Sequence, residues 1–285
     1  MTNPRDHRKG TRPLDPPPAT GDERLDALAR LLAILDRLRA PGGCPWDREQ
    51  TVDSMGPSLV EEAHEAQEAI ERRDDAGTVE ELGDLLVAVG LIGRIASEEG
   101  RFDVAAAARA AGDKLIRRHP HVFGDVEVTG SEHVLQNWER IKRDERTAAQ
   151  EDASALAGVP VALPALQRVQ RLSAKAIAAG FRWADDAGAL QKVAEEVEEL
   201  REAFAAGPAG RARLESELGD VLLATAIFAT YVGIDPERAT RRSLRRFEAR
   251  FRHMEAAMGE RFRGAPLDAM MAAWRAAKES TGEEA

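Results

Sequence analysis

Glu61-Glu62-Ala63-His64-Glu65 and Glu81-Leu82-Gly83-Asp84 decide the fold of this chain, because both motifs return in its second half. The second copy reads Glu195-Glu196-Val197-Glu198-Glu199 and then Glu217-Leu218-Gly219-Asp220. Residues three or four apart share one face of an α-helix. Each copy therefore predicts two helices with carboxylates on one face, separated by a break that contains glycine. We interpret the repeat as a duplicated acidic helical hairpin.

Apolar residues occupy a stripe beside the acids, and we expect these stripes to pack the two helices of each hairpin together. In the first hairpin the stripe residues are Leu59, Ala63, Ala66, Ile70, Leu82, Leu85, Leu86, Val89 and Ile92. Packing in this way would direct the carboxylates into a shared cleft, where like charges repel unless a cation lies among them. Oxygen-only ligands select hard cations, so we expect Mg²⁺, with Mn²⁺ as a substitute. The metal ligands predicted in the two halves are Glu62, Glu65, Glu81 and Asp84, and Glu196, Glu199, Glu217 and Asp220.

A simpler interpretation of the acidic motifs is that glutamate-rich helices are solvated, with Thr78-x-x-Glu81 serving as a capping box. It does not explain why the same spacing returns in the second half, where no threonine precedes the motif. Glycine inside a helix costs about 1 kcal/mol relative to alanine, yet Gly83 and Gly219 occupy matching positions. We infer that something approaches the helix backbone closely there.

Length, composition and net charge limit the kinds of protein to which this chain can belong. The chain has 285 residues, which indicates about two domains, and aromatic residues make up only 5% of it. It has no apolar run of membrane-spanning length and no evident signal peptide, so we expect no membrane association. Its one cysteine, Cys44, cannot form an internal disulfide, which is compatible with the cytoplasm. A net charge of −10 disfavours non-specific nucleic-acid binding.

The order of elements predicts an all-α fold of two tandem, duplicated helical-bundle domains. Residues 1–21 are proline-rich and charged and are predicted to form a disordered tail. The domains are predicted at residues 22–149 and 161–285, joined by a linker of small and polar residues at 150–160. No segment shows the sustained alternation of a β-strand. Cys44-Pro45-Trp46-Asp47 is expected to be a loop before the first acidic helix.

Paired cations and tryptophans also recur at a spacing of four residues, which places each pair on one helical face. Cations beside a metal–carboxylate cleft would suit a polyphosphate ligand. The alternatives are a solvated face for the cations and a packed core or interface for the tryptophans. The pairs are Lys114 with Arg118, Arg246 with Arg250, Trp138 with Lys142, and Trp274 with Lys278.

Together with Gly43-Cys44-Pro45-Trp46-Asp47 and Arg117-Arg118-His119-Pro120-His121-Val122-Phe123, these motifs resemble the MazG family of nucleoside triphosphate pyrophosphohydrolases. The resemblance covers about residues 22–280, in the two-domain form of the all-α NTP pyrophosphatase fold. It implies Mg²⁺-dependent hydrolysis of NTPs and dNTPs to the monophosphate and pyrophosphate, by substitution at the α-phosphorus. The role implied is nucleotide-pool house-cleaning or stress regulation, and a homodimer is the expected assembly.

The resemblance also implies site roles. The catalytic set would comprise Glu196, Glu199, Glu217 and Asp220. To these we add Glu195 as a hypothesis of our own, because it directly precedes a ligand and would orient or deprotonate water. Substrate-binding positions map to Lys192, Arg213, Arg246, Arg250, Trp274 and Lys278, and in the first half to Lys114, Arg118, Trp138 and Lys142. Ser58 stands where Lys192 stands, and Gly77 where Arg213 stands. We therefore expect the second domain to be the main catalyst, and the first to be weak, inactive or regulatory.

Two other functions are considered. A di-iron carboxylate bundle uses Glu-x-x-His on helices, and Glu61 to His64 has that spacing, but Glu198 replaces the histidine in the second half. The other alternative is a non-catalytic helical regulator whose acidic sites bind a nucleotide or a partner without turnover. Pyrophosphate release with and without Mg²⁺ distinguishes the regulator from the enzyme.

Overall fold

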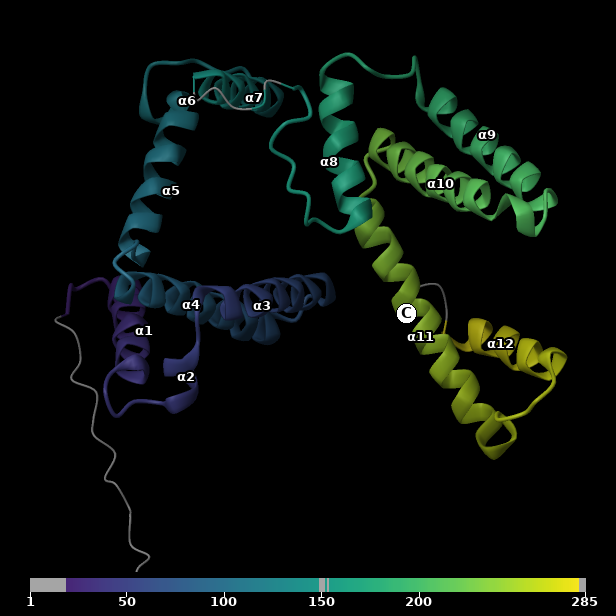
Figure 1. Cartoon of the computed structure of the whole chain (residues 1–285), viewed down its shortest axis with the longest axis horizontal. Helices are drawn as coiled ribbons and strands as arrows, with labels where there is room; N and C mark the ends of the chain where they lie inside the picture. The colour runs from purple at the N-terminus through teal and green to yellow at the C-terminus, as the bar shows by residue number, and fades with distance from the viewer. Residues whose placement is uncertain (1–18, 149–151, 153, 282–285) are drawn as a thin grey trace, which may run out of the picture. The chain divides into compact units, whose positions relative to one another are not determined.

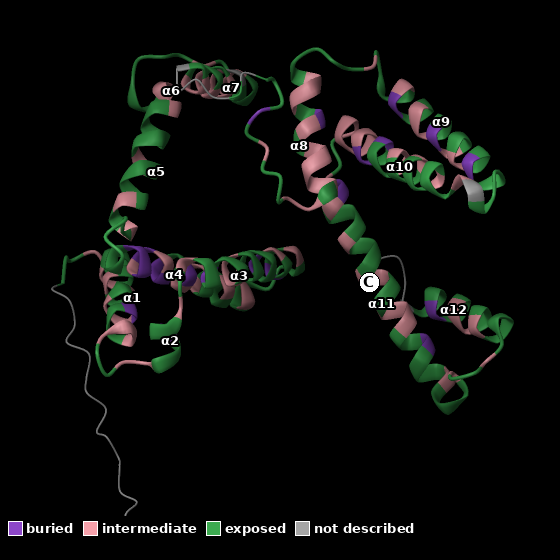
Figure 2. Cartoon of the chain, in the orientation of Figure 1, coloured by how far each residue is buried: buried purple, intermediate pink, exposed green. Residues whose placement is uncertain are grey.

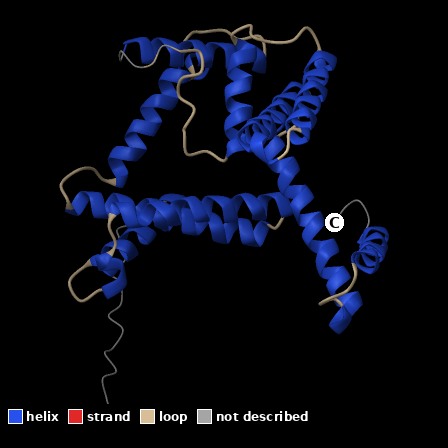
Figure 3. Cartoon of the chain, turned by 45° about the vertical axis from the view of Figure 1, so that its right-hand side comes forward, coloured by secondary structure: helices blue, strands red, loops and turns tan. Residues whose placement is uncertain are grey.

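A computed structural model describes residues 19–148, 152 and 154–281 of the chain. Throughout these residues the regular structure is helical, without a strand (Figure 3), which confirms the all-α prediction. The predicted tail lies outside the described residues up to position 18. The chain divides into two compact units, residues 1–142 and 143–285.

The first unit is built on the hairpin of α3 (Val52–Arg72) and α4 (Asp75–Glu98), which pack along their length (Figure 1). Helix α1 (Glu23–Arg39) packs on α4, and the short helix α2 (Pro45–Glu49) packs on α1. The core lies where α1 and α3 meet α4, and Figure 2 shows buried residues along α4. Its buried members are Leu35, Met55, Ala88, Leu91 and Ile95.

Helix α5 (Val104–Arg118) packs against the second half of α4, and α6 (Pro120–Phe123) and α7 (Ser131–Ala148) follow it. Gly93 on α4 makes this approach possible, because a Cβ there would lie 2.9 Å from the backbone nitrogen of Val104. The Asp103 side chain accepts a hydrogen bond from the Ala106 N–H at 2.6 Å and so caps the start of α5. A glycine and an aspartate thus fix where α5 leaves the hairpin.

The second unit repeats the hairpin with α9 (Asp186–Ala205) and α10 (Arg211–Tyr231), separated by a 3₁₀ turn at Pro208–Gly210. Helix α8 (Ala165–Ala178) packs on α10, as α1 packs on α4. Helix α11 (Pro236–Met258) contacts α8 and α10, and α12 (Leu267–Thr281) packs on α11 after a 3₁₀ turn at Gly259–Arg261.

At the starts of α4 and α2, one alternative interpretation of the sequence and one prediction were wrong. Thr78 does not cap α4: the helix begins at Asp75, the Asp74 side chain caps it, and the Thr78 hydroxyl donates to the Asp74 carbonyl at 2.7 Å. Residues 45–47, predicted as loop, lie in α2, because a proline fits the first turn of a helix, where no intrahelical N–H bond is lost.

The expected apolar stripe is only partly buried. Ala66 is buried, and Leu59, Leu85 and Ile92 are half-buried. However, the stripe is wider than the face that α3 and α4 share. Its remaining members are exposed: Ala63, Ile70, Leu82, Leu86 and Val89. The prediction that the whole stripe packs the hairpin was therefore wrong.

No single helix in the described part of the chain is both long enough and apolar enough to cross a membrane. Helices α10 and α11 pass that test of length and composition only as a pair, and the pair is bent by 110°.

Candidate metal centre

Three carboxylates of the first unit meet across its hairpin. Glu62 projects from α3, and Glu81 and Asp84 project from α4, one turn apart. One oxygen from each side chain lies within 4.8 Å of one oxygen from each of the others. Glu62 and Glu81 are half-buried and Asp84 is exposed, so the cluster opens to solvent on one side.

The electrostatics of this cluster favour a cation. Partial burial raises the pKa of Glu62 above its usual 4.5, and the negative charges of Asp84, Glu65 and Glu61 raise it further. The pKa of Glu81 is raised in the same way, first by partial burial and then chiefly by the charge of Glu65. Both shifts mean that the cluster resists full ionisation. A bound cation would offset the repulsion between the carboxylates and favour their ionised form.

The second unit repeats the arrangement with Glu196 from α9 and with Glu217 and Asp220 from α10. Their ligand oxygens also lie within 4.8 Å of one another. Glu196 is only 8% exposed, and Glu217 and Asp220 are half-buried, so this cluster is more enclosed than the first.

Two cations are paired with the second cluster. The Lys192 Nζ lies 2.7 Å from a Glu196 oxygen, and this hydrogen bond raises the pKa of Lys192. The Arg213 Nε donates to Glu217 at 3.3 Å, and another nitrogen of its guanidinium lies 3.5 Å from Glu202. The carboxylates that these cations contact are therefore the same ones that a metal ion would use as ligands. In the first unit the matching residues are Ser58 and Gly77, which carry no charge.

The fourth acid predicted in each half lies outside these three-carboxylate groups. Glu65 and Glu199 are exposed. Glu65 is nevertheless close enough for its charge to raise the pKa of both Glu62 and Glu81. Glu195 lies 3.7 Å from the Lys192 ammonium, beside the second cluster.

The donor sets suit a hard divalent cation. Each cluster offers only carboxylate oxygens, which Mg²⁺ and Mn²⁺ prefer over softer ligands. Each cluster also concentrates three acidic side chains in one small volume. The chemistry of the residues present therefore fits an Mg²⁺ ion in either unit.

Apart from Lys192 and Arg213, the predicted substrate residues lie on helices that supply no carboxylate to either cluster. Lys114 is exposed on α5 and Lys278 on α12, while Arg246 and Arg250 are half-buried on α11. Arg246 donates to the Ser243 hydroxyl at 2.9 Å.

The tryptophans make different contacts in the two units. The Arg118 guanidinium lies over the Trp138 ring, 5.9 Å from its centre, and His119 meets the same ring edge-on at 4.8 Å. Lys142, one turn after Trp138, pairs with Glu139 at 3.2 Å. Trp274 instead packs on Phe247, with their ring centres 5.4 Å apart.

Sequence reasoning missed Glu202, the second carboxylate beside Arg213. The available signal was its position three residues after Glu199, which places it on the same face of α9. It also missed the contact of His119 with Trp138, which joins the end of α5 to a helix 12 residues further along the chain. No periodicity within one helix could have predicted that contact.

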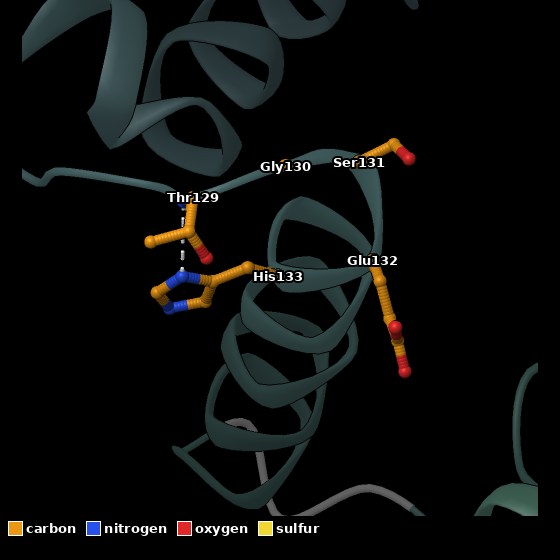
Figure 4. Close-up of a pocket in the computed structure, with 5 residues that line it drawn as sticks. All are labelled: Thr129, Gly130, Ser131, Glu132 and His133. Atoms are coloured by element: carbon orange, nitrogen blue, oxygen red, sulfur yellow. Dashed lines mark hydrogen bonds between the residues drawn. The ribbon is translucent and has the colours of Figure 1, made fainter.

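A hollow of about 530 Å³ lies at the start of α7 and is lined by Thr129, Gly130, Ser131, Glu132 and His133. Figure 4 shows the His133 ring under the Thr129 backbone, whose N–H donates to Nδ1 at 3.4 Å, while the Glu132 carboxylate points away. The hollow contains no member of either acidic cluster. It is therefore separate from the candidate metal centres.

Comparison with known proteins gives a consistent family match. The model of the MazG nucleotide pyrophosphohydrolase domain matches residues 50–123 and 187–255, which contain both acidic clusters. The chain is 41% identical to a nucleoside triphosphate pyrophosphohydrolase of Escherichia coli K12 over 258 residues, which cover 89% of this chain and 98% of that protein. It is 39% identical to the nucleoside triphosphate pyrophosphohydrolase/pyrophosphatase MazG of Thermotoga maritima, over 79% of this chain and 84% of that protein.

Proposed function

The chain belongs to the MazG nucleotide pyrophosphohydrolase family, and we propose that its second acidic cluster carries most of the activity and requires Mg²⁺. It is an enzyme, a nucleoside triphosphate pyrophosphohydrolase. The observation that carries the proposal is the difference in cations between the clusters. Glu196 and Glu217 are paired with Lys192 and Arg213, whereas the matching positions of the first unit are uncharged.

The cation pairs suit a triphosphate because its negative charge exceeds what one divalent ion neutralises. A metal ion held by the carboxylates would displace Lys192 from Glu196 and Arg213 from Glu217, and both cations could then turn to phosphate oxygens. They start within 2.7 Å and 3.3 Å of the acids, so the change requires only side-chain rotation. Arg246, Arg250 and Lys278 are proposed to complete the phosphate contacts, and Trp274 to border the site.

The reaction is proposed to be attack of water on the α-phosphorus. A bond forms between the water oxygen and that phosphorus, the bond to the oxygen bridging the α- and β-phosphates breaks, and pyrophosphate leaves. When bound, Mg²⁺ would lower the pKa of water and withdraw charge from the phosphate oxygens. Glu196, Glu199, Glu217 and Asp220 would hold the ion, and Glu195 would orient the attacking water and accept its proton.

The first unit is proposed to be weakly active or regulatory. Its cluster of Glu62, Glu81 and Asp84, with Glu65 beside it, can hold a divalent cation. However, Ser58 and Gly77 leave two phosphate contacts unfilled. We propose that it binds Mg²⁺ and nucleotide without rapid turnover, with Lys114, Arg118, Trp138 and Lys142 as its substrate residues. The enzyme is proposed to act as a homodimer in nucleotide-pool house-cleaning or stress regulation.

The direct experiment follows pyrophosphate and monophosphate release from a panel of NTPs and dNTPs, with Mg²⁺ and with a chelator. The proposal expects equal amounts of both products, and none in chelator. With labelled water, the labelled oxygen should enter the monophosphate. Label in pyrophosphate would show attack at the β-phosphorus and contradict the mechanism, and release of inorganic phosphate alone would contradict the reaction.

A further inference from the structure

An apolar pocket of about 190 Å³ lies in the second unit, between α8, α10 and the loop that precedes α9. Two aromatic rings form one side of it: Trp183 and Tyr231 meet edge to face with their centres 5.5 Å apart. Gly188 in the first turn of α9 allows Trp183 to lie close, since a Cβ there would be 3.3 Å from that side chain. The argument below uses Ala176, Trp183, Leu223, Ile227 and Tyr231 from its lining.

The pocket and the acidic cluster lie in sequence along one face of α10. The residues of this face are spaced three or four apart, and their order is cation, two acids, two apolar residues and a phenol. They are Arg213, Glu217, Asp220, Leu223, Ile227 and Tyr231. At about 1.5 Å per residue, Leu223 and Ile227 lie about 4.5 and 10.5 Å beyond Asp220 along the helix. The pocket therefore begins one turn from the proposed site of α-phosphate attack.

In the described part of the first unit, buried core residues occupy the positions that match two of the pocket residues on α10. Glu81 corresponds to Glu217, so Leu91 and Ile95 correspond to Ile227 and Tyr231. Both are nearly completely buried, in a core that Leu35 and Met55 complete. The space next to the first cluster is thus filled by the protein's own side chains. In the second unit it remains open to a ligand.

We propose that this pocket receives the nucleobase of the triphosphate while the phosphates lie at Glu196, Glu217 and Asp220. The inference rests on the proposed function of that cluster. A cavity of about 150 Å³ is known to hold a benzene ring, so this one admits a planar heterocycle. Aromatic rings at its side offer faces and edges for stacking, which tolerates every base.

A polar group inside the pocket can read the edge of the base. The Tyr231 hydroxyl accepts a hydrogen bond from the backbone N–H of Trp183 at 2.7 Å. Accepting that bond does not use the phenol's own hydrogen, which can be donated to a carbonyl or ring nitrogen of a base. Ser173, only 8% exposed, lies 3.5 Å from the Thr230 hydroxyl, at the same end of α10. The nucleobase is therefore expected to lie against Trp183 with its polar edge toward Tyr231.

The test fills the pocket without touching the acids or their cations. Ala176→Leu places a larger side chain in the pocket, and Ala176→Ser at the same position leaves it open. For the wild type and both variants of the full chain, the dissociation constants of an NTP and of inorganic tripolyphosphate are measured with Ca²⁺. Tripolyphosphate carries the phosphates but no base. Pyrophosphate release from the NTP with Mg²⁺ is measured alongside.

The expected result is that Ala176→Leu weakens NTP binding about tenfold to a hundredfold and leaves tripolyphosphate binding unchanged, while Ala176→Ser binds both as the wild type does. Unchanged NTP binding in Ala176→Leu would overturn the inference, and so would an equal loss for both ligands, because the effect would then be structural. A wild type that binds NTP but releases no pyrophosphate would instead overturn the proposed function. The two failures are therefore distinguishable.

Discussion

Replacing Lys192 by methionine separates its two proposed roles, as the internal counter-charge of the second cluster and as a phosphate contact. Its ammonium lies 2.7 Å from Glu196 and 3.7 Å from Glu195. Methionine keeps a stem of similar length and removes the charge. Without metal, the variant leaves the largely buried Glu196 carboxylate without this partner.

The size of the effect follows from the exposure of the pair. A hydrogen bond to a charged group contributes about 1.5–3 kcal/mol, but the Lys192 side chain is 38% exposed and solvent screens the pair. We therefore expect Lys192→Met to lower the free energy of unfolding of the metal-free protein by about 1 kcal/mol. The same change removes a competitor of the metal ion. Affinity for Mn²⁺ without nucleotide should rise by about fivefold, while KM for the NTP increases.

The assay is a Mn²⁺ titration by electron paramagnetic resonance, in an Asp84→Asn background that removes a ligand of the first cluster. The matched control is Ser58→Lys in an Asp220→Asn background. It places an ammonium four residues before Glu62 and should weaken Mn²⁺ binding at the first cluster. Unchanged or weaker Mn²⁺ binding in Lys192→Met would refute the view that Lys192 and the metal compete for the same carboxylates.

Two further substitutions test the fold that holds the clusters. Gly93→Ala adds a Cβ 2.9 Å from the Val104 backbone nitrogen, so we expect chemical denaturation to show a loss of about 1–2 kcal/mol. Gly83→Ala meets nothing within 4 Å and should stabilise by up to about 1 kcal/mol; the reverse ranking would refute this account of helix packing. Glu98→Gln breaks the 2.7 Å pair with the largely buried Arg39 and should cost about 1–2 kcal/mol at neutral pH. Since that pair lowers the Glu98 pKa from 4.5, its stabilisation is present above pH 4.5 and is lost as pH falls through the lowered folded value. The wild type and Glu98→Gln should therefore converge in acid, and a constant difference down to low pH would argue against the pair.

The sequence was enough to predict the helices because their signals are local. Helices α5 and α11, for example, begin directly after Asp103 and Asp235, whose side chains cap them. The repeated spacing also named the three acids that meet in each unit, whereas their binding of metal stays a prediction. The acids could be named because residues three or four apart lie on the same face of a helix.

The remaining features depend on contacts between segments far apart in the chain. We inferred that something approaches the helix backbone closely at Gly83 and Gly219, but no other part of the described chain does so. Apart from the chain neighbours and the adjacent backbone of the same helix, no atom lies within 4 Å of a Cβ placed at either position. Whatever favours glycine there is not close packing of this chain. The exposure of Leu82 and Leu86 could not be predicted either, since an apolar stripe does not reveal how much of it a neighbour covers. Nor does composition reveal that the space beside the second cluster is open while its counterpart is filled.

The most direct measurement of the central claim compares Glu81→Gln with Glu217→Gln in the full chain. These residues occupy matching positions in the two clusters, and each change removes one carboxylate charge with almost no change in shape. Pyrophosphate release from an NTP at saturating Mg²⁺ should fall by at least about a hundredfold in Glu217→Gln, and by less than about twofold in Glu81→Gln. Equal losses, or a greater loss in Glu81→Gln, would contradict the assignment of catalysis to the second cluster.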